Sequence, residues 1–153
     1  MPRDFWKEAI IIKNHSSAKE YLSQVKKINV SLKTMARQVQ FVTDSLYNIS
    51  PTITNTPRSA TPDVHRMEGL IATKIDVENE MVTASEKLGG IIRTVNALPD
   101  SFQRELITSR YLEGKGWSKI AADLNFSQSH VYRLHNAALD ELGKLIADES
   151  FKK

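Results

Sequence analysis

Apolar residues recur at alternating intervals of three and four along two long segments of the chain. The first series consists of Ala18, Tyr21, Val25, Ile28, Leu32, Met35, Val39, Val42, Leu46 and Ile49. The second has a single polar member, Lys74, and consists of Met67, Leu70, Lys74, Val77, Met81, Ala84, Leu88, Ile91, Val95 and Leu98. This spacing places each series along one side of an α-helix, as in coiled coils. The sequence therefore predicts two long helices that pack along these two apolar seams.

The limits of these helices are marked by capping residues. Ser17 followed by Glu20 has the form of a capping box, and Thr61-Pro62 has the form of a second helix start. Between the helices, residues from about 50 to 62 are rich in Pro, Ser and Thr, which is typical of an exposed loop. Two helices of similar length joined by such a loop predict an antiparallel hairpin. Lys74 is expected at the edge of its seam, with its charge in water.

The second helix carries more apolar residues than one partner helix can cover. Beside its seam lie Ile71, Ile75, Val82 and Ile92. A stripe of this width needs a second cover. One cover is a short N-terminal helix that would complete a monomeric three-helix bundle and that bears Phe5, Trp6, Ala9 and Ile10. The other is a second copy of the chain, and we favour this homodimer through the N-terminal helices.

The pattern changes at Leu98. Pro99 interrupts the long helix, and Asp100 with Gln103 can cap a new helix over residues 101–112. Gly114 and Gly116 then suit the positive φ values found at helix ends. We therefore predict two parts, a helical coiled-coil and oligomerisation region at 1–97 and a second domain at 98–153.

Residues 117–136, WSKIAADLNFSQSHVYRLHN, have the pattern of a helix-turn-helix. In such a motif two helices cross steeply over a three-residue turn. Asn125 stands at the turn, where asparagine tolerates the left-handed conformation, and Ser127 can cap the second helix. The core positions of the motif are filled by Ile120, Ala121, Leu124, Phe126, Val131 and Leu134. The expected fold is all-α, a long antiparallel hairpin followed by a helix-turn-helix domain.

The second helix of the motif then presents polar side chains away from its core. Arg133 is suited to guanine and Gln128 to adenine in the major groove of double-stranded DNA, and positively charged side chains around the turn are suited to backbone phosphates. A capping role for Ser129, packing for Tyr132 and plain solvation for the cations are the alternatives. The predicted DNA-binding residues are Arg110, Lys115, Lys119, Ser127, Gln128, Ser129, His130, Tyr132 and Arg133.

Composition excludes other classes of protein. The 153 residues include no cysteine, so disulfide and thiolate metal sites are excluded. His130 and His135 are five residues apart and do not share a helix face, so we expect no metal, and no cofactor. No phosphate-binding loop or nucleophile motif is present, which predicts a protein that is not an enzyme. No apolar run approaches the ~20 residues of a membrane-spanning helix, and a cytoplasmic location in a bacterial host is expected.

The C-terminal stretch resembles sigma-factor region 4 in several places. These are the Leu98-Pro99 opening, the Arg110-Tyr111 helix end, the Trp117-to-Leu124 helix and the tail formed by Ala137, Ala138, Leu139 and Leu142. The segment SQSHVYRLHNAAL, together with FWKEA and NHSSAKEYLSQVKKI, is similar to small phage late-gene transcription regulators of the ArpU/RinA type. This resemblance implies promoter binding and activation of phage genes together with host RNA polymerase. Gln128-Ser129 departs from it, because such proteins often carry arginine there.

Two other functions compete with a DNA-binding regulator. A small phage terminase subunit also joins a helix-turn-helix to oligomerisation helices, but usually in the reverse order. A module that binds RNA polymerase without touching DNA fits the near-neutral C-terminal half, since residues 98–153 hold eight Lys or Arg against eight Asp or Glu. The sequence alone does not separate these alternatives.

Overall fold

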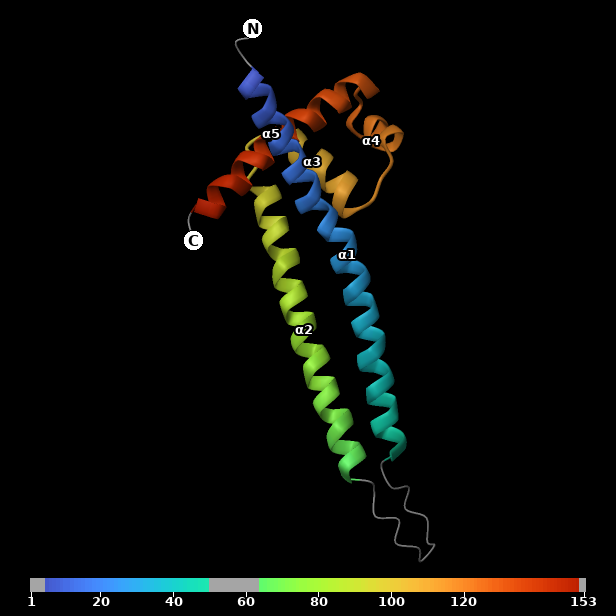
Figure 1. The fold of residues 1–153 in the computed structure, drawn as a ribbon. Helices are drawn as coiled ribbons and strands as arrows, with labels where there is room; N and C mark the ends of the chain where they lie inside the picture. Colours follow the sequence, from blue (N-terminus) through green and yellow to red (C-terminus); the bar gives the residue numbers. More distant parts are fainter. Residues whose placement is uncertain (1–4, 50–63, 152–153) are drawn as a thin grey trace, which may run out of the picture. The chain divides into compact units, whose positions relative to one another are not determined.

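A computed structural model describes residues 5–49 and 64–151. The elements follow one another in the order α1 (Phe5–Ile49), α2 (Val64–Asn96), α3 (Ser101–Ile107), the π-helical turn η1 (Thr108–Leu112), α4 (Trp117–Leu124) and α5 (Gln128–Phe151) (Figure 1). Within these ranges there is no strand, so the predicted all-α fold class is confirmed. The same ranges contain no helix that is both long enough and apolar enough to cross a membrane.

The first helix is longer than predicted. A start at Ser17 is wrong, because α1 runs without a break from Phe5 to Ile49. No glycine or proline stands between these two residues, so nothing in this stretch forces the backbone out of the helix. A Ser-x-x-Glu pattern caps a helix only where the preceding residues leave the helical conformation. The separate short N-terminal helix is therefore also wrong.

The two apolar seams are confirmed. Every seam residue of α1 and α2 is buried or half-buried, and between residues 28 and 87 the two helices run antiparallel, side by side (Figure 1). Lys74 lies at the edge of its seam, as expected. Its side chain is 34% exposed, and its Nζ lies 4.0 Å from Oε1 of Glu78, one turn further along α2. The predicted loop at about 50–62 and the Thr61-Pro62 helix start lie outside the described residues.

By its contacts the chain forms two compact units. One contains residues 28–87, and the other joins residues 1–27 to residues 88–153. The core of the second unit is made by side chains from both ends of the sequence: Ala18, Leu22, Val25, Ile91, Val95, Leu98, Leu106, Ile107, Ile120, Val131, Ala138, Leu139 and Leu142. The predicted division at residue 98 concerns independent folding and stays a prediction.

The predicted change at Leu98 is confirmed in detail. Asp100 has an extended backbone and caps α3, since its Oδ1 accepts hydrogen bonds from the amides of Phe102 and Gln103 at 2.8 and 3.4 Å. The helix expected over 101–112 is α-helical only to Ile107 and continues as the π-helical turn η1. Gly114 follows with a φ of +71°, a value that glycine adopts without strain.

Gly143 marks a close approach between α5 and α1. A Cβ atom placed at Gly143 would lie 2.5 Å from Cβ of Asn14 and 2.7 Å from its Cα and carbonyl oxygen. Backbone atoms cannot move aside as the end of a flexible side chain can, so any side chain at this position forces the two helices apart.

Gly143→Ala is expected to lower the free energy of unfolding by roughly 1–3 kcal/mol because of this overlap. Gly69→Ala is the matched control, because Gly69 is also helical and a Cβ there meets nothing within 4 Å. The control should stabilise the protein by about 0.5–1 kcal/mol, since alanine favours the helix. Urea unfolding followed by circular dichroism measures both variants. Equal effects of the two substitutions would contradict the close approach.

Candidate nucleic-acid interface

The turn between α4 and α5 has the predicted backbone. Asn125 adopts the left-handed conformation with a φ of 59°, and its amide bonds to the carbonyl groups of Ala121 and Ala122. Ser127 caps α5, since its Oγ accepts a hydrogen bond from the amide of His130 at 3.2 Å. Ile120, Ala121 and Val131 are buried, and the other three predicted core residues, Leu124, Phe126 and Leu134, are half-buried. The two helices and their turn thus have the backbone conformation, cap and buried positions predicted for this stretch.

The first two turns of α5 present an exposed polar surface. It consists of Gln128, Ser129, His130, Tyr132 and Arg133, all of which are exposed, as predicted. Three of these side chains are held by neighbours. Nε2 of Gln128 donates to Oγ of Ser118 at 3.1 Å, His130 stacks on Phe126 at 4.2 Å, and the Tyr132 ring lies 5.2 Å from Trp117. The structure therefore orders much of this surface before any partner arrives.

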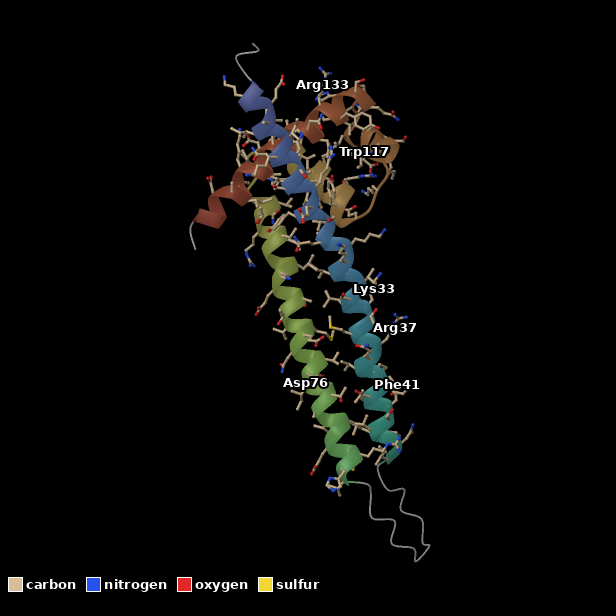
Figure 2. All side chains as sticks on the ribbon, viewed as in Figure 1. Lys33, Arg37, Phe41, Asp76, Trp117 and Arg133 are labelled. Atoms are coloured by element: carbon tan, nitrogen blue, oxygen red, sulfur yellow. The ribbon has the colours of Figure 1, made fainter. Side chains whose placement is uncertain are left out.

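Arg133 differs from its neighbours on α5. It is exposed and makes no hydrogen bond, ion pair or ring contact with any residue that the structure describes. Figure 2 shows it on α5. A guanidinium without a partner among the described residues retains its donors for bidentate contacts with an external acceptor.

Lys115 and Lys119 face a local source of negative charge. Asp123 accepts from both of them, at 3.4 Å from Nζ of Lys115 and 3.2 Å from Nζ of Lys119, and Glu113 lies 3.0 Å from Lys115. The hydrogen bond from Lys119, followed by that from Lys115, lowers the pKa of Asp123, while the hydrogen bond to Glu113 raises the pKa of Lys115. The positive charge of these two lysines is therefore largely balanced by the two neighbouring carboxylates.

Arg110 has a structural role that its sequence position does not indicate. Its guanidinium lies 4.4 Å from the centre of the Trp117 ring, and Nη1 donates to the carbonyl oxygen of Lys115 at 3.1 Å. These contacts connect η1 to the loop before α4 and to the start of α4 itself. The planar cation over the indole face is an attractive arrangement, and it stiffens the approach to the turn.

A buried histidine lies behind the exposed surface. His135 is only 6% exposed, its Nε2 shares a hydrogen bond of 2.9 Å with the hydroxyl of Tyr111, and its ring meets the edge of Trp117 at 4.7 Å. Burial, followed by the positive charges of Lys19, Arg110 and His15, lowers the pKa of His135 from 6.5 to about 4. Burial also raises the pKa of Tyr111. At neutral pH both groups are uncharged, and His135 is buried while Tyr111 is half-buried.

Sequence reasoning found the exposed surface but missed this cluster of Arg110, Tyr111, Trp117 and His135. His135 drew attention only as a possible metal ligand. Among the described residues no group of three or more His, Cys, Asp or Glu side chains is placed to hold a metal ion. The sequence offered one signal for the cluster, the aromatic residues Tyr111 and Trp117 in the stretch before α5. Trp117 stands eighteen residues before His135 and on a different helix, so their contact was not apparent from spacing.

Fold and site together define an all-helical protein in which α4 and α5 are joined by a short turn and α5 begins with a preformed polar surface. The chain belongs to the family described as protein of unknown function DUF1492, which matches residues 58–143. The match covers α2, α3, η1 and α4, as well as α5 as far as Gly143. Comparison with curated proteins and with solved structures gave no match.

The low pKa of His135 predicts a loss of stability in mild acid. In the unfolded chain the imidazole binds a proton below about 6.5, but in the folded protein only below about 4. The unfolded state therefore gains protons first, and stability falls as the pH drops from 6.5 towards 4. We expect a loss on the order of 1 kcal/mol between pH 7 and pH 5, after allowance for solvent screening.

Urea unfolding at the two pH values measures this loss. His135→Gln removes the titrating group, so the variant should be less stable at neutral pH but should lose less stability on acidification. His130→Gln is the control, because His130 is exposed and its variant should keep the pH dependence of the parent protein. An unchanged acid sensitivity in His135→Gln would show that another group is responsible.

Proposed function

We propose that this protein is a sequence-specific DNA-binding transcription regulator. The observation that supports the proposal best is the surface of Gln128, Ser129, His130, Tyr132 and Arg133 at the start of α5. In helix-turn-helix proteins the N-terminal residues of the second helix enter the major groove of DNA. Here that part of the helix is exposed, polar and supported by ring contacts to Trp117 and Phe126.

Each side chain receives a role from its surroundings. Arg133, which has no partner in the described residues, reads guanine, and Ser129 and Gln128 approach bases at the helix start. Lys119, which is 66% exposed, contacts a phosphate. Arg110 and Ser127 act indirectly, since the first braces the turn against Trp117 and the second caps α5.

The resemblance to sigma-factor region 4 and to phage late-gene regulators of the ArpU/RinA type supplies the finer part of the proposal. On that basis the protein activates phage or prophage genes together with host RNA polymerase, and it acts as a homodimer formed through the N-terminal helices. The family match itself carries no function, so this part depends on the quoted motifs alone.

The roles of Arg133 and Lys119 can be separated by measurement. A preferred duplex is first selected from random DNA with the full-length protein. Arg133→Ala should then weaken binding to this duplex by ~1–3 kcal/mol and bind random DNA almost as before. Lys119→Ala should weaken both about equally and reduce the salt slope by about one unit.

Fluorescence anisotropy over a range of salt concentrations gives both quantities. Lys87→Ala on α2 is the control, because it removes an exposed positive charge outside the helix-turn-helix. The same loss on selected and random duplexes for Arg133→Ala would reject base reading. If the full-length protein binds no DNA even at low salt, the module that binds RNA polymerase without DNA becomes the better proposal.

Asp123 offers a test in the opposite direction. Asp123→Asn removes the carboxylate that Lys115 and Lys119 share, so more positive charge faces the phosphates. Binding to random DNA should become tighter and more dependent on salt, with a slope steeper by about one unit per phosphate gained. Asp76→Asn on α2 changes net charge equally and should have little effect. Weaker binding by Asp123→Asn would mean that Asp123 organises the surface rather than opposing DNA.

A further inference from the structure

Within the described part of the hairpin formed by residues 28–87, α2 carries an apolar stripe that is left exposed. Four aliphatic side chains of α2 are highly exposed: Val64 at 54%, Ile71 at 44%, Ile75 at 51% and Val82 at 56%. Together with Glu68 and Glu78 they are spaced alternately by four and three residues, the same interval as in the seam. This spacing aligns them on one side of α2, and contiguous exposed apolar surface of this kind marks an interaction site.

The stripe and one side of α1 belong to the same face of the hairpin. Glu68, Ile71, Ile75, Glu78 and Val82 each follow a seam residue of α2 by one position. On α1 the residues that follow the seam by one position are Lys33, Ala36, Gln40, Thr43 and Tyr47. Each residue of a right-handed helix is rotated by about 100° from the residue before it. Because the two helices run antiparallel, the residues that follow the seam by one position therefore point to the same face of the hairpin. We call these ten residues and Val64 the stripe face.

The other face of the hairpin is different in character. There Thr34, Gln38, Phe41 and Thr73 precede seam residues by one position and line a shallow groove of about 450 Å³ together with Arg37, Val42 and Val77. Apart from Phe41, the exposed side chains that precede the seam are polar or small. The stripe face is therefore the one that needs a cover.

Charge on the stripe face is divided between the two helices. The α1 part carries Lys33 and no acid, and the α2 part carries Glu68 and Glu78 and no base. A second hairpin can pack on this face with antiparallel helices in two arrangements. In one, α1 of one copy lies on α2 of the other, and in the other, α2 lies on α2 and α1 on α1. Opposite charges, Lys33 of one copy and Glu78 of the other, come within about one helical turn of each other only where α1 of one copy lies on α2 of the other.

We propose that the stripe face docks a second copy of the same face, with a two-fold axis parallel to the helices, to form a four-helix bundle. Each α2 stripe then packs between α1 of its own chain and α1 of the partner chain. All neighbouring helices are antiparallel, as in up-and-down bundles. The alternative two-fold arrangement packs α2 of one copy against α2 of the other. It brings the carboxylates of Glu68 and Glu78 close to the same carboxylates of the partner copy, where they repel one another.

The size of the face fits a stable dimer. A face over residues 64–85 is about 33 Å long and, for two helices each about 10 Å wide, roughly 20 Å across. This corresponds to roughly 650 Å² per copy, close to the ~800 Å² per partner of specific protein interfaces. The proposal gives a surface to the homodimer of the proposed function and does not depend on DNA binding.

The first experiment measures the oligomeric state of the full-length protein by sedimentation equilibrium. Ile75→Glu places a charge in the middle of the stripe face and should raise the dimer dissociation constant at least ~10-fold. Ala72→Glu is the matched control, because Ala72 is exposed on the same helix but outside the stripe face, and its variant should dimerise like the parent. Since both positions are exposed, neither substitution disturbs the core.

The second experiment fixes the arrangement with disulfides, which the absence of native cysteine makes simple. Gln38 and Val42 share a groove with Thr73 and Val77, so Gln40 stands level with Ile75. In the proposed dimer these two positions meet between chains. The double variant Gln40→Cys/Ile75→Cys should form a covalent dimer under mild oxidation, while each single variant should not.

Three results would overturn the proposal: a monomeric parent protein, a dimer unaffected by Ile75→Glu, or a covalent dimer from Ile75→Cys alone. The last would place α2 against α2. Fluorescence anisotropy measures the binding of Ile75→Glu to the selected duplex. This measurement tests the dimer proposal separately from the DNA-binding proposal. If dimerisation is absent but Arg133→Ala still loses base preference, this inference fails and DNA binding stands. The reverse pattern would leave the dimer and remove the DNA-binding proposal.

Discussion

The contact between the apolar seams of α1 and α2 is the constraint on which the other features depend. A seam with a spacing of three and four fixes the rotation of each helix about its axis, because a different rotation would expose the apolar side chains. Once that rotation is set, every other side chain has an assigned direction. The exposure of Ile71, Ile75 and Val82 follows from the direction of the seam residues Leu70, Lys74 and Met81, which stand one position earlier and are half-buried.

The helix-turn-helix arrangement combines a rigid support with a nearly balanced charge. Trp117 provides the support, since its ring contacts Arg110, Tyr132 and the buried His135. At the surface, Asp123 and Glu113 balance Lys115 and Lys119, so that Arg133 is a prominent positive charge without a local partner in the described residues. A surface with this balance would depend on the geometry of a few contacts more than on long-range attraction.

Much of the fold could be predicted from the sequence because it rests on local rules. The seams, the cap at Asp100, the left-handed Asn125 and the cap at Ser127 each depend on residues within a few positions of one another. The start of α1 could not be predicted, since Ser17 matches a capping pattern whether or not the helix continues before it. The Arg110–Trp117 contact and the ion pairs of Asp123 depend on how separate helices meet, and on the π-helical turn that carries Arg110. Spacing along the chain does not contain that information.

The contact between Gly143 and Asn14 joins two residues separated by nearly the whole chain. It has a consequence for the order of events during synthesis. Residues 28–87 have their own contacts and can pair as soon as they leave the ribosome. Ala18, Leu22 and Val25 emerge earlier, but α5, which completes their unit, follows residues 28–87 in the chain. Until α5 has been made, these apolar side chains lack part of their core and stay exposed. A nascent chain that stalls before α5 would therefore expose them to chaperones.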